Sequence, residues 1–229
     1  MARKARIHQV VPELPHHVVL RGNNRRRLFS YNADRLKFCQ LLVLATKKTG
    51  CLVHHLSLLS NHIHMLVTPP SVEALSHFVR RAAQPYAQSR NRQRGGTGKL
   101  FEQRFWSRPV ECSEYLAVVS AYIDLNPEQA GVGPRLLRWS TKGYYEGYPH
   151  LSSIPTSLLT PSPWYLDLGK TCASRHHRYR AWLQYYLEHQ QRLRESFTIA
   201  QHAEEGSSNR NGEPPHSKRL ERPDRSSAR

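Results

Sequence analysis

The stretch Ser60-Asn61-His62-Ile63-His64-Met65-Leu66-Val67 places two histidines one residue apart at the start of an apolar run. Successive side chains of a β-strand point to opposite faces, so His62 and His64 share one face while Ile63 points into the opposite layer. Two imidazoles on one strand face can bind a single metal ion. The same pattern also fits a half-buried strand with two polar residues on its wet side. A metal site therefore needs a third ligand and a reactive group from other parts of the chain.

The composition indicates a polyanionic partner. The chain has 229 residues, enough for one sizeable domain with appendages or for two small ones. Lys and Arg number 34 against 17 Asp and Glu, a formal net charge of +17, which favours nucleic acid as the partner. A membrane surface is the rival polyanion, but neither a basic amphipathic helix nor a long apolar segment supports it.

Cysteine usage and the first residues bear on the compartment. The four cysteines are scattered and form no C-x-x-C pair, which argues against zinc fingers and disulfide frameworks. The basic start of the chain lacks a following apolar stretch, so we expect no signal peptide. The sequence therefore predicts a cytoplasmic nucleic-acid-binding protein without membrane attachment.

The first half of the chain predicts strand, helix, strand, strand. Residues 16–21 form an apolar strand closed by a Gly-Asn-Asn turn. A helix is expected from Asn32, as its N-cap, to near Gly50. Two strands follow, at residues 52–59 and from His62 to the Pro-Pro pair that stops the histidine strand.

The next segment predicts helix, strand, helix. Ser71 is expected to cap the second helix, and Pro85 to break or kink it, because proline lacks a backbone donor and clashes with the preceding turn. A strand is expected near residues 109–111. Ser113 is expected to cap a third helix, which Pro127 should end.

This order predicts an α+β fold. The first six elements match a split βαβ, ferredoxin-like antiparallel sheet with helices on one face, followed by an extra helix and a C-terminal helical extension. We assign residues 1–150 to the main domain and 151–198 to an accessory segment with a basic helix. Residues 199–229 contain little apolar sequence and are expected to form a disordered tail.

Clusters of cations with aromatic neighbours are candidates for contacts with DNA. Aromatic faces that stack on bases beside guanidinium groups suit single-stranded nucleic acid, although core aromatics beside surface charge give the same pattern. The candidate nucleic-acid-binding residues are Arg25, Arg26, Arg27, Arg80, Arg81, Arg104, Phe105, Trp106 and Arg108.

The third helix supplies a candidate reactive group. Tyr122 and Asn126 lie four residues apart and hence on one helix face. If that helix packs beside the histidine strand, Asn126 can offer a carbonyl oxygen to a metal while Tyr122 presents its phenol nearby. Tyr115 lies seven residues earlier on nearly the same face, without a polar residue four positions on, and we interpret it as a packing residue.

Three motifs resemble those of REP-associated tyrosine transposases, a group of histidine–hydrophobe–histidine (HUH) single-tyrosine nucleases. They are Asn61–Val67, Phe101–Phe105 and Tyr122–Pro127, in this order along the chain. The Arg21-Gly22-Asn23 turn and Trp139-Ser140 are also similar to the family. The resemblance spans roughly residues 5–170.

The resemblance implies a ferredoxin-like nuclease fold, a bound Mg²⁺ or Mn²⁺ ion and a tyrosine that attacks single-stranded DNA. Mapped by motif, it implies His62, His64 and Asn126 as metal ligands and Tyr122 as the catalytic nucleophile, with a 5′-phosphotyrosine intermediate. The expected partner is single-stranded or hairpin DNA formed by repeated palindromes. Gln129 stands where the family commonly has arginine, so one phosphate contact is in doubt.

Other functions stay open at this point. A non-catalytic DNA-binding protein, such as a repressor, could use the same fold. A metal-dependent phosphoesterase could use activated water in place of Tyr122. The sequence does not distinguish a monomer from a homodimer.

Overall fold

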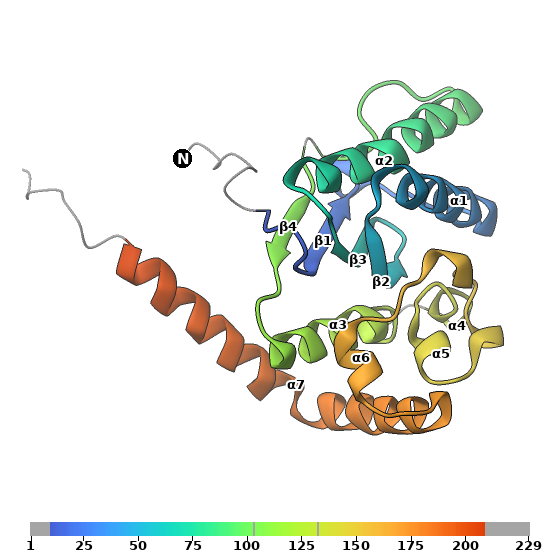
Figure 1. Ribbon diagram of the computed structural model, residues 1–229. Coiled ribbons are helices and arrows are strands. Elements are labelled where there is room, and N and C mark those ends of the chain that lie inside the picture. Colours follow the sequence, from blue (N-terminus) through green and yellow to red (C-terminus); the bar gives the residue numbers. More distant parts are fainter. Residues whose placement is uncertain (1–9, 103, 132, 209–229) are drawn as a thin grey trace, which may run out of the picture. The chain divides into compact units, whose positions relative to one another are not determined.

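The structure is a computed structural model and describes residues 10–102, 104–131 and 133–208. The elements from β1 to α3 follow the predicted order of strand, helix, strand, strand, helix, strand, helix. These are β1 (His16–Arg21), α1 (Asn32–Thr49), β2 (Leu52–Leu58), β3 (His62–Thr68), α2 (Val72–Arg94), β4 (Trp106–Pro109) and α3 (Ser113–Gln129), as seen in Figure 1. The short helices that follow are α4 (Pro134–Leu137), α5 (Lys142–Tyr145) and α6 (Pro163–Asp167), before the long α7 (Cys172–Ser208).

The four strands form one sheet in the order β2-β3-β1-β4, and every neighbouring pair is antiparallel. This is the strand order that a split βαβ unit produces, so the predicted ferredoxin-like α+β fold is confirmed. The sheet pairs the histidine strand with β1, setting Val19 opposite His64 and Arg21 opposite His62.

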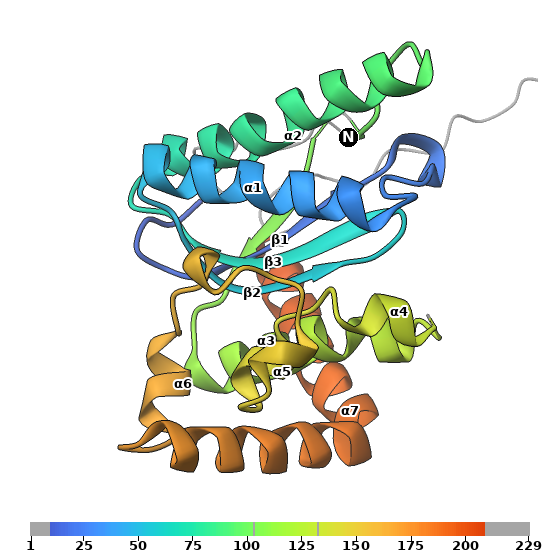
Figure 2. The ribbon, with the colours of Figure 1, turned by 90° about the vertical axis from the view of Figure 1, so that its right-hand side faces the viewer.

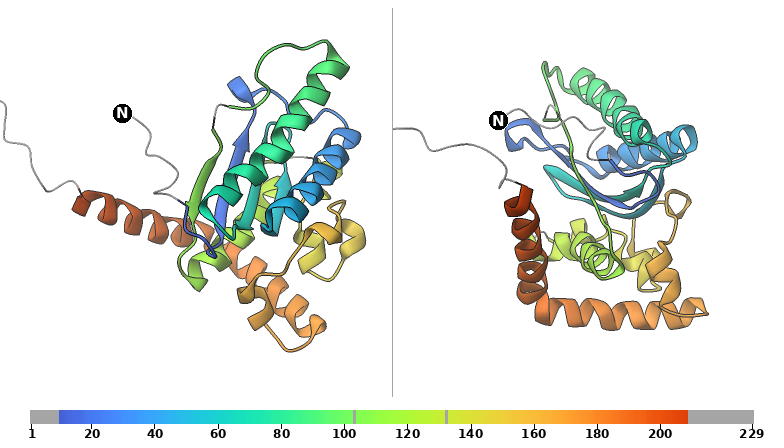
Figure 3. Two further views of the ribbon diagram at one scale, coloured as in Figure 1. Left: turned by 45° about the horizontal axis from the view of Figure 1, so that its top comes forward. Right: turned by 60° about the vertical axis from the view of Figure 1, so that its left-hand side comes forward.

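Helices cover both faces of this sheet. Helices α1 and α2 lie side by side on one face, whereas α3 lies against the other, as Figures 2 and 3 show. The prediction that helices lie on one face of the sheet is correct for α1 and α2. The extra helix α3 adds a layer that contacts β2 and β3.

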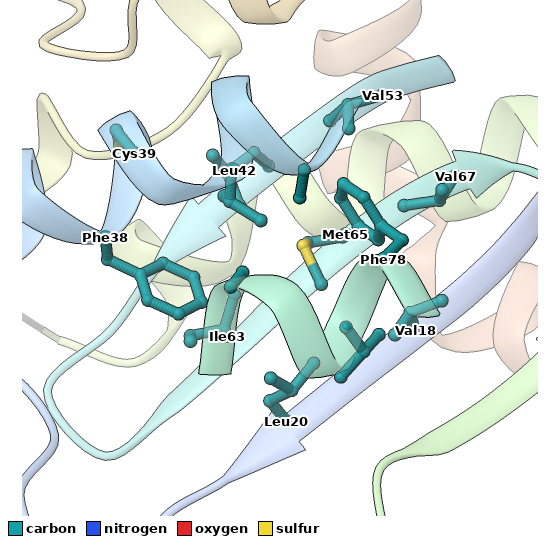
Figure 4. Packing of buried hydrophobic residues seen from close by; sticks show 14 of the residues in the cluster. Val18, Leu20, Phe38, Cys39, Leu42, Val53, Ile63, Met65, Val67 and Phe78 are labelled. Carbon is teal, nitrogen blue, oxygen red and sulfur yellow. The ribbon is translucent and has the colours of Figure 1, made fainter. Parts of the chain in front are cut away.

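The core between the sheet and the pair α1/α2 follows from strand alternation. Ile63, Met65 and Val67 point from β3 toward these helices, where they meet side chains such as Phe38 and Phe78 (Figure 4). All five are fully buried, and burial of each such side chain contributes about 1.5–3 kcal/mol. The alternate residues of β3, including both histidines, must consequently face α3.

A carboxyl group, that of Asp34, stabilises the start of helix α1. Asn32 was predicted as the N-cap, but the cap residue is Tyr31, and Oδ2 of Asp34 accepts from the backbone N–H groups of Ser30 and Tyr31 at 2.8 and 3.0 Å. The Asn32 side chain instead accepts from Nε1 of Trp139 at 3.2 Å. Gly50 ends the helix as predicted, in a left-handed conformation with φ +70°.

The other helix boundaries differ in part from the prediction. Ser71 caps α2, its Oγ accepting from the N–H of Ala74 at 3.2 Å, but α2 continues past Pro85 to Arg94. Pro85 is exposed, so water can satisfy the carbonyl that loses its partner, while Tyr86 remains buried in the core. Helix α3 likewise includes Pro127 near its end, and its cap is Cys112 rather than Ser113.

The chain divides into two compact units, residues 1–190 and residues 191–229. The first holds the sheet, helices α1 to α6 and the beginning of α7, so residues 151–190 of the predicted accessory segment pack within the same unit as the sheet. The second unit is described as far as residue 208, as the rest of α7. Helix therefore covers the first part of the predicted tail 199–229, and residues 209–229 lie outside the described residues. The division of the chain at residues 150 and 198 into segments with separate roles stays a prediction.

In the part of the chain that the structure describes, no helix has the length and apolar character needed to cross a bilayer.

Candidate active site

Strand pairing and alternation gather four side chains on the sheet face opposite α1 and α2. Val18 and Leu20 of β1 belong to the core beneath α1 and α2, so His17 and Arg21 project to the other face with His62 and His64 of β3. The rings of His62 and His64 are nearly perpendicular, with centroids 4.9 Å apart. The shared face predicted for the two histidines is confirmed.

Helix α3 brings Tyr122 and Asn126 to these histidines. The Tyr122 ring stands edge-on to His64, with centroids 5.3 Å apart, and the Asn126 side chain is hydrogen-bonded to His62. Leu116, Val119 and Ile123 anchor the helix by packing against the sheet in an apolar cluster. The structure therefore joins two motifs that lie far apart in the sequence, with Tyr122 beside one histidine and Asn126 beside the other.

Each of the two histidines is held at its Nδ1 atom. Nδ1 of His62 lies 2.8 Å from Oδ1 of Asn61, and Nδ1 of His64 lies 3.0 Å from Nε2 of His17. Hydrogen bonds of this kind fix the ring orientation of metal-binding histidines. In His64, Nε2 is then the nitrogen that remains for another ligand, whereas His62 also has a hydrogen bond with Asn126.

The environment keeps these imidazoles neutral. Burial lowers the pKa of His17 to about 4. Burial, with His17, His62 and Arg21 adding positive charge nearby, lowers the pKa of His64 well below its ordinary value. Burial and then Arg21 also lower the pKa of His62, whereas its hydrogen bond with Asn126 raises it. Neutral imidazole is the form that binds metals, so the site is suited to a cation at neutral pH.

The donor set fits a divalent cation with nitrogen and oxygen ligands. Among the described residues, no group of three or more His, Cys, Asp or Glu side chains could hold a metal, so a third protein ligand has to come from another residue type. The Asn126 amide, already hydrogen-bonded to His62, is such a donor. Two imidazoles and one amide oxygen leave further coordination positions for phosphate oxygens or water.

The second tyrosine of α3 has a different environment. Tyr115 packs against the apolar cluster of α3, and the guanidinium carbon of Arg108 lies 5.7 Å from the centre of its ring. Tyr122 packs against the same cluster but is also in contact with two imidazoles, those of His64 and His17. The interpretation of Tyr115 as a packing residue agrees with this position.

Eight of the nine predicted DNA-binding residues lie in three places, and Arg81 lies apart from them. Arg25, Arg26 and Arg27 are exposed on the loop after β1, which is fixed to the β2–β3 turn by hydrogen bonds from Gly22 to Asn61 and from Leu28 to Ser60. Gly22 is required there, because a Cβ atom would lie 2.1 Å from the carbonyl oxygen of Arg26.

A groove of about 810 Å³ gathers the second group. Residues 99–102 run beside the end of β1, since Asn23 donates to Leu100 and Glu102 donates to Arg21 through backbone groups. The groove lies between this segment, the end of β1 and α2. Its cationic and aromatic lining residues are Arg21, Arg80, Lys99, Phe101, Arg104 and Phe105.

Trp106 and Arg108 form the third group, on the α3 side of β4. The Trp106 ring is 45% exposed and stands edge-on to His17, with centroids 5.2 Å apart. Arg81 is exposed on α2. The structure thus brings Trp106, but not the groove residues, next to the candidate active site.

Sequence reasoning missed two features near Tyr122. One is His17, for which the His16-His17 pair at the start of an apolar strand was the available signal. The other is Asp124, which is fully buried and accepts from Tyr179 at 2.7 Å, from Nδ1 of His55 at 3.2 Å and from the hydroxyl of Thr141. This hydrogen-bonded group ties α3 to β2 and to α7.

Fold and sequence together place the chain among the transposases. It belongs to the family described as "Transposase IS200 like", whose model matches residues 10–126, just over half of the chain. Among curated proteins no match was found.

A solved structure supports the fold. The structure described as "Structure of the REP associates tyrosine transposase bound to a REP hairpin" matches with a TM-score of 0.53 and 14% sequence identity, over 71% of this chain and 93% of that one. The family match and this likeness in fold confirm the resemblance that the three motifs predicted.

Proposed function

We propose that this chain is a metal-dependent single-stranded DNA endonuclease and strand transferase with Tyr122 as its nucleophile. The observation that supports this most directly is the position of α3, which sets the Tyr122 ring 5.3 Å from His64 and hydrogen-bonds Asn126 to His62. One helix thereby brings a phenol and an amide oxygen to two neutral imidazoles.

The reaction follows from the chemistry of a tyrosine nucleophile. The phenol oxygen of Tyr122 attacks the scissile phosphorus, a new P–O bond to tyrosine forms, and the P–O3′ bond breaks. The phenol loses its proton and the departing 3′ oxygen gains one, leaving a 5′-phosphotyrosine and a free 3′-OH. Because one phosphodiester replaces another, a second 3′-OH can reverse the step and join a new strand without ATP.

His62, His64 and Asn126 are the residues that would hold the cation, Mg²⁺ or Mn²⁺. When bound, such an ion supplies charge neutralisation at the phosphate and stabilises the leaving oxygen. The chain's own contribution is position: Asn61 and His17 fix the two rings, and the packing of α3 fixes Tyr122 relative to them.

We propose hairpin-forming single-stranded DNA as the substrate. The net charge of +17 suits a nucleic acid, and the protein of similar fold is described as bound to a REP hairpin. Unpaired bases fit the aromatic side chains of the groove, where Arg80, Lys99 and Arg104 lie near Phe101 and Phe105.

Incubation of the protein with end-labelled hairpin DNA and Mn²⁺, followed by denaturing electrophoresis, tests this proposal. We expect cleavage together with a covalent adduct between the protein and the 5′ end of the downstream DNA fragment, and a free 3′-OH on the other fragment. Cleavage without an adduct would indicate activated water as the nucleophile. Binding without cleavage, with either Mg²⁺ or Mn²⁺, would indicate a non-catalytic DNA-binding protein.

A further inference from the structure

The two histidines among the candidate metal ligands have different hydrogen-bond partners. The partner of His62 at Nδ1 is the amide oxygen of Asn61, at 2.8 Å. An amide oxygen only accepts hydrogen bonds, so Nδ1 of His62 carries the proton and its Nε2 keeps a lone pair. The partner of His64 is a second imidazole, Nε2 of His17 at 3.0 Å, and such a bond can run in either direction.

The direction of this bond decides whether His64 can bind a cation. If His17 donates, Nδ1 of His64 accepts and its proton resides on Nε2, which then has no lone pair for a metal. If His17 accepts, the proton resides on Nδ1 of His64, and Nε2 is available. The same relationship already holds for His62 and Asn61.

The surroundings of His17 hold its ring in one place. It is 7% exposed, and its ring meets that of His64 edge to edge through their hydrogen bond, with centroids 5.3 Å apart and an interplanar angle of 27°. The rings of Trp106 and Tyr122 meet it edge-on, at 5.2 and 5.7 Å. Three rings, from β3, β4 and α3, therefore contact the His17 ring. A neutral imidazole has one nitrogen that accepts, so Nε2 of His17 can accept the proton of Nδ1 of His64, 3.0 Å away.

We propose that His17 is a positioning residue that accepts the Nδ1 proton of His64 and thereby leaves Nε2 of His64 free to bind the divalent cation. This inference rests on the proposed metal site. His17, on β1, then accepts the Nδ1 proton of His64, just as Asn61 accepts that of His62. Partners of this kind typically change metal affinity 10- to 100-fold when they are removed.

Two variants separate hydrogen bonding from packing. His17→Phe keeps a ring against Trp106 and Tyr122 but has no acceptor for His64. His17→Gln loses the ring but offers an amide oxygen at a similar distance from the backbone. His54→Gln is the matched control, because His54 is a buried strand histidine whose partners are Thr68 and Thr160.

The first measurement is the tautomer of His64, read from long-range ¹H–¹⁵N correlation spectra of metal-free protein with ¹⁵N-labelled histidine. We expect the Nδ1–H form in the wild type and its loss in His17→Phe. The Nε2–H form in the wild type would overturn the inference, and this reading depends on no variant that has to fold.

The second measurement is Mn²⁺ affinity, from titrations followed by electron paramagnetic resonance. We expect His17→Phe to raise the Kd about 10-fold or more, His17→Gln to stay within about threefold of the wild type, and His54→Gln to match it. Equal affinity in His17→Phe and the wild type would overturn the inference and leave the metal site intact. A wild type that binds no Mn²⁺, or a His64→Ala protein that binds it equally well, would refute the proposed metal site and this inference with it.

Discussion

The ring of Tyr122 stands at 89° to the ring of His64, with 5.3 Å between their centroids. The two residues come from α3 and β3 of the same chain, so the nucleophile and the metal site that we propose are complete within a single copy. The contact requires α3 to cover the sheet face opposite α1 and α2. This geometry leads to the following predictions.

Replacement of His64 should separate cleavage from binding. His64→Ala removes a candidate metal ligand without touching the groove, so we expect DNA cleavage to fall at least 100-fold while hairpin affinity changes less than about threefold. Cleavage is measured at saturating Mn²⁺ and binding by fluorescence anisotropy. Undiminished cleavage by a folded variant would contradict the metal-site assignment.

We predict that removal of a cationic side chain from the groove weakens DNA binding more than removal of one elsewhere on the surface. Arg80→Ala should weaken binding of single-stranded DNA and reduce the slope of log affinity against log salt by about 0.7, the value for one phosphate contact. Lys48→Ala is the control. Lys48 is exposed at the end of α1, so this substitution removes one positive charge outside the groove. Equal slopes for the two variants would show that DNA does not follow the groove.

The buried carboxyl group of Asp124 predicts a stability effect. Tyr179→Phe removes the hydroxyl that lies 2.7 Å from Oδ2 of Asp124, so the free energy of unfolding should fall by about 1.5–3 kcal/mol. Tyr185→Phe in the same helix removes a hydroxyl from a ring that is 47% exposed and should change it by less than about 0.5 kcal/mol. Urea titrations measure both, and similar values would contradict a stabilising role for the Asp124 group.

Acid should destabilise the fold through its buried histidines. The pKa of His17 and the pKa of His54 are each lowered by burial from 6.5 to about 4. Between these values the unfolded chain binds more protons, so stability is lost as the pH falls from about 6.5 toward 4. Each histidine should cost about 1–2 kcal/mol between pH 7 and pH 5. Urea titrations at the two pH values should show a smaller difference in His54→Gln, and an unchanged difference would refute this assignment.

The sequence predicted the strands and the shared face of His62 and His64 because alternation is a local property of a strand. It did not predict the place of His17, since strand pairing between β1 and β3 depends on the tertiary fold. The predicted break at Pro85 is wrong for a related reason: the packing of Tyr86 stabilises the helix beyond an exposed proline. Asp124 was overlooked because its partners lie on β2, on α7 and at Thr141, far from it in the sequence.

Tyr122 as the covalent nucleophile is the central claim, and two matched variants test it. Tyr122→Phe and Tyr115→Phe each remove one phenol oxygen from α3, but only Tyr122 is in contact with His64. The assay is incubation of each protein with labelled hairpin DNA and Mn²⁺, denaturing electrophoresis, and peptide mapping of the adduct. We expect the wild type and Tyr115→Phe to form an adduct at Tyr122, and Tyr122→Phe to bind DNA without forming one. An adduct that persists in Tyr122→Phe and disappears in Tyr115→Phe would contradict the assignment.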